Sequence, residues 1–112
     1  MVAQKLHFSL TPMEMAYQYF SIISSLNSLQ LTPMQIRLLA FMVVRGTITN
    51  PAAREDFCLM YSTSKAVINN AICRMKKKGL LIKDASTIKV IPQLALDFTS
   101  SVTLQIRLYD KG

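Results

Sequence analysis

The chain has 112 residues, a net charge of +7 and 51% apolar residues. This length suits one domain whose core needs no metal or disulfide, and the apolar content argues against disorder. The longest apolar run, residues 38–44, is far shorter than the roughly 20 residues of a membrane span, and residues 1–10 lack a secretion-signal pattern. We therefore expect a cytoplasmic protein with no membrane partner.

Positive charge is concentrated in one segment of the sequence. Residues 65–89 hold seven of the 13 basic side chains and one of the six acidic ones, so the rest of the chain is nearly neutral. A local excess of one sign favours a polyanionic partner, with nucleic acid as the first candidate. An anionic membrane surface fits less well, because the basic residues do not flank a face rich in Trp, Phe and Leu.

Two Thr-Pro pairs predict the starts of helices. Thr11 and Thr32 are expected N-caps, each followed by proline at the first helical position and by Glu or Gln as the other half of a capping box. We predict helices at residues 12–27 and 33–45, the second ending at Gly46. The first helix has an apolar face wider than one neighbouring helix covers, which predicts a further partner there.

Two more helices are expected after a short extended piece at residues 47–49. An Asn-Pro pair starts a short helix at about residues 51–59 by the same cap-and-proline pattern. A longer helix is expected to begin at Ser62 or Thr63 and to run to Lys78. Its apolar residues recur at spacings of three, four and seven, which predicts one buried stripe. The stripe consists of Ile68, Ala71, Ile72 and Met75.

Beyond the fourth helix the pattern becomes strand-like. Residues 80–83 and 87–91 flank the short turn Asp84-Ala85-Ser86, which predicts a β-hairpin. Residues 102–109 alternate between apolar and polar, as in a half-buried strand, and residues 5–10 alternate similarly and could pair with them. The expected fold class is α+β and mainly helical.

This order of elements is that of a winged helix-turn-helix with a C-terminal β-hairpin wing. Residues 31–91 resemble the DNA-binding core of the multiple-antibiotic-resistance repressor (MarR-type) family. The most specific stretch is STSKAVINNAICRMKKKGLL at residues 62–81, and Leu31-Thr32-Pro33 before the scaffold helix is similar too. Within a single domain over residues 1–112, we expect residues 12–27 to form an accessory or dimerisation helix.

The expected strand at residues 102–109 departs from the family, whose dimer is closed by long C-terminal helices. Ligand sensing and the geometry of the family's dimer are therefore not carried over to this chain. The resemblance implies sequence-specific binding of double-stranded DNA by a transcriptional regulator, which we expect to be a homodimer formed through residues 12–27 and the terminal strands.

The expected DNA contacts centre on residues 63–78, a recognition helix whose first residues lie nearest the base edges. Candidate contacts near the bases are Ser62, Thr63, Ser64, Lys65, Asn69 and Asn70. Candidate phosphate contacts are Arg74, Lys76, Lys77 and Lys78 at the helix end, Lys83 and Lys89 on the hairpin, and Arg37, Arg45 and Arg54 elsewhere. Each residue type also has a purely structural role: Ser and Thr cap helices, cations stabilise a helix C-terminus, and Asn and Lys are ordinary exposed residues.

No enzyme activity, metal or cofactor is expected. Glu55 and Asp56 are adjacent on a helix and point apart, unlike a working pair of carboxylates. The three glycines lie too far apart for a phosphate-binding loop. His7, Cys58 and Cys73 do not have zinc-site spacing, and we expect both cysteines to be reduced, partly buried thiols.

Two other functions stay open. A structural or protein-interaction module, for example in a phage particle or a replication complex, could use the same fold. The strand expected at residues 102–109 could then add to the sheet of another subunit. An RNA-binding role is less favoured, because the sequence offers no evident surface platform of aromatic residues.

Overall fold

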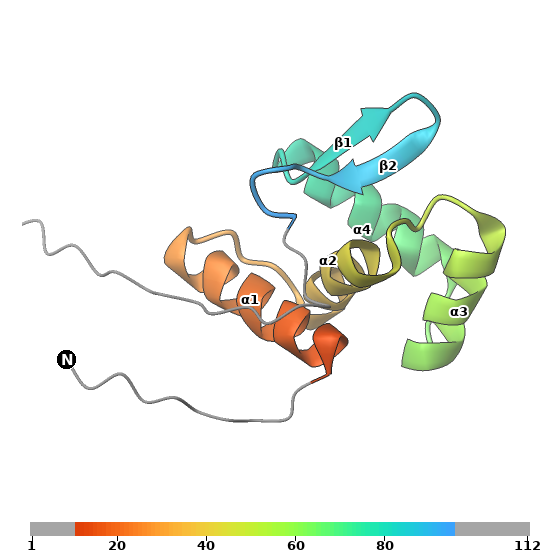
Figure 1. Cartoon of the computed structure of the whole chain (residues 1–112), viewed down its shortest axis with the longest axis horizontal. Coiled ribbons are helices and arrows are strands. Elements are labelled where there is room, and N and C mark those ends of the chain that lie inside the picture. The colour runs from red at the N-terminus through yellow and green to blue at the C-terminus, as the bar shows by residue number, and fades with distance from the viewer. Residues whose placement is uncertain (1–10, 96–112) are drawn as a thin grey trace, which may run out of the picture.

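The computed structural model describes residues 11–95, which form an α+β arrangement of four helices followed by a two-stranded antiparallel hairpin (Figure 1). The elements are α1 (Pro12–Leu26), α2 (Pro33–Arg45), α3 (Pro51–Tyr61), α4 (Lys65–Lys77), β1 (Leu81–Asp84) and β2 (Thr87–Val90). The four helices and the hairpin predicted from the sequence are thus present. The strands expected at residues 5–10 and 102–109 lie outside the described residues.

The helix starts follow the predicted cap-and-proline chemistry. Thr32 Oγ1 accepts from the Gln35 amide at 3.2 Å, and Gln35 Oε1 accepts from the Thr32 amide at 3.0 Å, which completes a capping box. Thr11 accepts from the Glu14 amide at 3.2 Å, but there the carboxylate of Glu14 accepts from the Thr11 hydroxyl and not from the Thr11 amide, so the capping box expected at this helix start was wrong. Asn50 Oδ1 caps α3 by accepting from the Ala53 amide at 2.7 Å.

The boundary between α3 and α4 differs from the prediction. α3 extends to Tyr61. The ring centre of Tyr61 lies 4.9 Å from that of the buried Phe57, so the last turn of α3 is held against the core. Ser62 follows in the left-handed conformation as the C-cap of α3. The N-cap of α4 is Ser64, which accepts from the Val67 amide at 3.4 Å. The expected start at Ser62 or Thr63 was therefore wrong.

α2 runs through the centre of the molecule, with α1 on one side, α3 and α4 on the other, and the hairpin above (Figure 1). The core lies around α2 and includes the fully buried side chains of Phe20 in α1, Leu38 in α2 itself and Phe57 in α3. The rings of Phe41 and Phe57 meet edge to face at 5.4 Å between centroids, which joins α2 to α3. The stripe predicted for α4 is buried as expected. This packing fixes which side of α4 faces outward.

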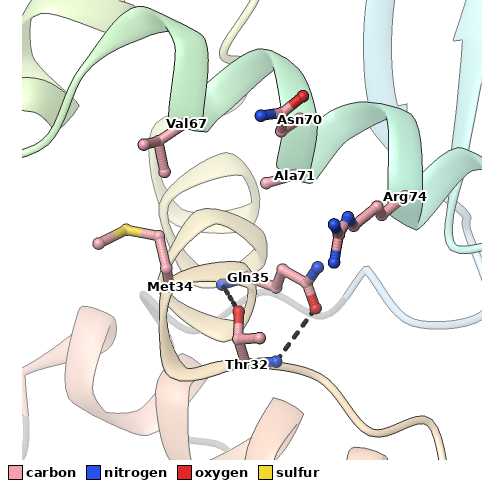
Figure 2. Close-up of a pocket in the computed structure, with 7 residues that line it drawn as sticks. All are labelled: Thr32, Met34, Gln35, Val67, Asn70, Ala71 and Arg74. Atoms are coloured by element: carbon pink, nitrogen blue, oxygen red, sulfur yellow. Dashed lines mark hydrogen bonds between the residues drawn. The ribbon is translucent and has the colours of Figure 1, made fainter.

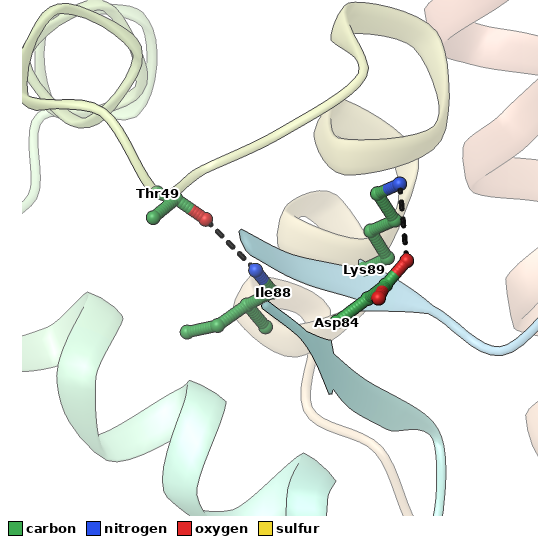
Figure 3. A network of polar contacts seen from close by, with 4 residues as sticks. All are labelled: Thr49, Asp84, Ile88 and Lys89. Carbon is green, nitrogen blue, oxygen red and sulfur yellow. Dashed lines mark hydrogen bonds and ion pairs between the residues drawn. The ribbon is translucent and has the colours of Figure 1, made fainter. Parts of the chain in front are cut away.

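The hairpin is joined to residues 47–49, the segment that precedes α3. The Ile88 amide donates to Thr49 Oγ1 at 2.9 Å (Figure 3), and the Thr49 amide donates to Thr47 Oγ1 at 2.9 Å. In the described part of the chain the sheet has two strands, and residues 47–49 do not form a third. The segment contacts β2 through the side chain of Thr49. Asp84 pairs with Thr87, which leaves a turn one residue shorter than expected.

Candidate nucleic-acid interface

The outer face of α4 is the candidate binding surface. Ala66, Cys73 and Lys77 are exposed, and their spacings of seven and four place them opposite the buried stripe at 3.6 residues per turn. The sequence of α4 contains four cationic side chains and no acidic one. A helix presented in this way offers polar and positively charged groups to a partner without any opposing carboxylate of its own.

The two asparagines of α4 lie on different flanks of this face. Asn70 and Arg74 line a shallow groove between α4 and the start of α2 (Figure 2). Asn69 lies on the flank toward α3, where Nη1 of Arg54 donates to its Oδ1 at 2.7 Å. The groove is also lined by Thr32, Met34, Gln35, Val67 and Ala71. The asparagines therefore face different surroundings, although both are exposed.

The beginning of α4 gathers the other candidates for base contact. Ser62, Ser64 and Lys65 are exposed, whereas Thr63 in the turn is half-buried. The Ser64 oxygen accepts the capping hydrogen bond, so its hydroxyl hydrogen stays free to donate. Of these four residues, Ser62, Ser64 and Lys65 are the ones the fold presents openly at the helix start.

The cations at the end of α4 have unequal roles. Arg74, Lys76 and Lys77 are exposed. The ammonium of Lys78 donates to the carbonyl of Leu29 in the loop between α1 and α2. Lys78 thus ties α4 to its own chain, while the other three cations remain available to a partner.

The hairpin carries one lysine with an ion-pair partner and one without such a partner among the described residues. Lys89 Nζ lies 3.8 Å from Asp84 Oδ2, with the side chains 53% and 70% exposed (Figure 3). Such an exposed pair contributes little to stability, but the carboxylate weakens the positive field of Lys89. Lys83 is exposed on β1 and is the stronger candidate for contact with a phosphate.

Within residues 11–95, the arginines outside α4 have contacts within the fold. The guanidinium of Arg37 lies 5.4 Å from the ring centre of Tyr61, and that of Arg45 lies 5.7 Å from the ring centre of Phe41. Arg54 reaches the flank of α4. Cation–π contact positions the first two arginines against the helices. Among the described arginines outside α4, Arg54 is therefore the one that the fold brings to the candidate surface.

Cys73 was missed as part of the surface. The expectation of two partly buried thiols holds for Cys58 and is wrong for Cys73, which is exposed. Cys73 follows Asn69 by four residues and Asn70 by three, a spacing that places it on their side of α4. That spacing is visible in the sequence and could have indicated its position.

Residues 11–95 contain neither a metal-binding cluster nor a membrane-spanning helix. There, no three side chains of His, Cys, Asp or Glu come together in a way that could hold a metal ion. No helix of that region is both long and apolar enough to cross a membrane. Burial raises the pKa of Tyr19 in α1, outside the candidate surface.

The chain matches no protein-family model, no curated protein and no solved structure. Its resemblance to the MarR-type family thus stays a prediction from the sequence. The function has to be inferred from the surface of α4 and from the elements that present it.

Proposed function

We propose that the chain is a winged helix-turn-helix protein that binds double-stranded DNA in a sequence-specific way, regulates transcription and acts as a homodimer. The observation that carries the proposal is the outer face of α4, which is exposed, is flanked by asparagines and cations, and has no acidic residue. With 13 residues, α4 is about 20 Å long. The major groove of B-DNA, about 12 Å wide, admits a helix of this kind.

The join between α3 and α4 supports a helix-turn-helix. Three residues separate Tyr61 from Lys65, which is the length of turn that this motif uses. The turn leaves Ser64 and Lys65 exposed at the start of α4, where a recognition helix approaches the base edges. Lys76 and Lys77 at the other end suit contact with phosphates.

The hairpin suits the role of the wing. It follows α4 directly and packs on α2 and α4, so its position relative to the outer face of α4 is fixed. Lys83 on β1 would contact the DNA backbone beside the groove that α4 enters. Lys89 is assigned a smaller part because Asp84 lies beside it.

α1 supports the proposed homodimer. Its half-buried apolar residues include Tyr17 and Ile22, and Leu26 at its end is 58% exposed. A two-fold dimer is the commonest way to cover such a surface. It would also place two copies of α4 on successive turns of one DNA face. The contribution expected from residues 102–109 lies outside the described residues.

Selection of bound sequences from a random duplex pool tests the proposal. We expect one sequence pattern to be enriched, repeated with two-fold symmetry because the protein is a dimer. The affinity for the selected duplex should fall steeply with salt, since each phosphate contact releases counterions. Failure of the full chain to bind any duplex at low salt would contradict the proposal.

The second candidate is a protein-interaction module, which a surface on α3 favours. Leu59 and Met60 are 76% and 46% exposed, and Glu55 and Asp56 are exposed on the same helix. An apolar pair beside two carboxylates suits a basic protein partner, and a second copy of this chain, with its net charge of +7, is such a partner. If the protein bound no duplex but self-associated, and Leu59→Lys abolished that association, this candidate would be favoured.

A further inference from the structure

Arg54 bridges three parts of the proposed DNA-binding unit. From α3, its Nε donates to the carbonyl of Ile48 at 3.0 Å, and its Nη1 donates to Oδ1 of Asn69 on α4 at 2.7 Å. The Arg54 side chain is half-buried, and Asn69 is exposed. A guanidinium held at two of its nitrogens has little freedom to rotate, because its donors form a rigid planar fork.

This contact fixes which way the carboxamide of Asn69 points. Arginine has only donors, so the atom of Asn69 facing it must be the oxygen. A hydrogen bond from a charged donor is stronger than one between neutral groups. The amide nitrogen of Asn69 is therefore directed away from Arg54, and its two hydrogens are available to a ligand.

An asparagine oriented in this way differs chemically from the usual reader of adenine. Contact with adenine uses both atoms of the carboxamide, with the oxygen accepting from N6 and the nitrogen donating to N7. In Asn69, Arg54 takes one lone pair of the oxygen and holds the oxygen toward α3, so the amide donor is the group turned toward a ligand. Guanine presents two neighbouring acceptors, N7 and O6, in the major groove, whereas cytosine presents a donor there.

We infer that Arg54 is a positioning residue that orients Asn69 so that its amide donor faces the DNA, and that this orientation selects guanine over adenine at one base pair of the bound site. The inference rests on the proposed function, because it requires α4 to lie in the major groove. Asn70 has a different neighbourhood, beside Arg74 at the groove against α2, so the inferred orientation applies to Asn69 alone.

Two variants test the inference through the order of base preference. Arg54→Met removes the guanidinium donors but keeps a long, unbranched side chain. The oxygen of Asn69 then becomes free to accept from a base. Asn69→Asp keeps an acceptor for Arg54 and removes the donor that faces the DNA. Asn70→Asp is the matched control, since it makes the same change of charge one residue away.

The experiment is the selection from a random duplex pool, carried out with the full-length wild type and the three variants, and followed by binding to duplexes that differ at the selected guanine. We expect the wild type to prefer guanine to adenine by about tenfold at one pair of each half-site. Arg54→Met should shift that preference toward adenine, and Asn69→Asp should abolish it. Asn70→Asp should lower affinity without changing the preference at that pair.

The possible results separate this inference from the proposed function. If the wild type binds no duplex, both are overturned. If it binds duplex DNA selectively but folded Arg54→Met keeps the same guanine preference, the inference alone is overturned. A thermal melt establishes whether Arg54→Met is folded. If it is not, a guanine preference retained by Asn69→Asp overturns the inference in the same way.

Discussion

The backbone N–H of Ile88 donates to Oγ1 of Thr49 across 2.9 Å, so a threonine side chain holds the edge of β2 that faces away from β1 (Figure 3). The two residues are 39 positions apart in the chain. The bond joins the hairpin to the segment that also receives Arg54 through the carbonyl of Ile48. The proposed wing and the proposed reading face are therefore tied to the same short segment.

The substitution Thr49→Val tests the importance of this connection. Valine keeps the shape of threonine but cannot accept, so the half-buried Ile88 amide loses its partner. We expect the free energy of unfolding to fall by about 1–2 kcal/mol, the usual cost of an unsatisfied donor. Hydrogen exchange should become faster at the Ile88 amide. Thr87→Val, the same change within β2, should have little effect, and equal effects of the two variants would contradict the assignment.

The turn of the hairpin contains a residue in an unfavourable backbone conformation. Ala85 has a φ of 55°, a region that costs a residue with a Cβ roughly 1 kcal/mol or more. Ala85→Gly should therefore raise the free energy of unfolding by about 0.5–1 kcal/mol, after allowance for the greater freedom of glycine in the unfolded chain. Denaturant titration measures the change. Ser86→Gly, in the same turn, should not raise the free energy of unfolding. Equal stabilisation by the two variants would contradict the role assigned to the φ of Ala85.

Local sequence patterns predicted most of the fold. The caps at Thr32 and Asn50 need only residues within one helical turn, so their chemistry is legible in the sequence. The start of α4 was missed because three successive hydroxyl residues, 62–64, can all serve as N-caps. Packing of Tyr61 on Phe57 extends α3 and decides among them, and no local pattern reveals that contact.

The candidate site was predictable only in part. The period of apolar residues predicted the buried stripe of α4 and hence the opposite, exposed face. The contact of Arg54 with Asn69 joins residues on two helices, and that of Lys78 with Leu29 joins residues 49 positions apart. Both depend on how the helices cross, which the sequence does not state. The sequence therefore did not show that Lys78, unlike Lys76 and Lys77, has a partner within the fold.

Lys77 and Lys78 should respond differently to the same substitution. Lys77 lies opposite the buried stripe, whereas Lys78 bonds to the Leu29 carbonyl. We expect Lys77→Ala to reduce the slope of log affinity against log salt by about 1, as for one lost phosphate contact. Lys78→Ala should leave that slope nearer the wild-type value and lower the free energy of unfolding by up to about 1 kcal/mol.

The two lysine variants serve as controls for each other, since both remove one positive charge from the end of α4. Fluorescence anisotropy over a range of salt concentrations gives the slopes, and thermal melts give the stabilities. Equal slopes for the two variants would show that a DNA contact does not distinguish Lys77 from Lys78.

Cys73 provides a chemical probe of the proposed interface. It is exposed beside the asparagines on the outer face of α4, while Cys58 is half-buried. In Cys58→Ala, Cys73 is the remaining thiol of a chain that has two cysteines. We expect saturating duplex DNA to slow its alkylation by iodoacetamide several-fold, because a helix in the major groove has its outer face covered.

High salt should restore the alkylation rate by releasing the DNA, which shows that the protection comes from binding. Prior modification of Cys73 with a bulky maleimide should block binding, whereas Cys73→Ser should bind almost as well as the wild type because serine fits the same space. If duplex is bound but Cys73 reacts at an unchanged rate, then α4 does not enter the groove with this face. The DNA contact would then have to be sought on another part of the molecule.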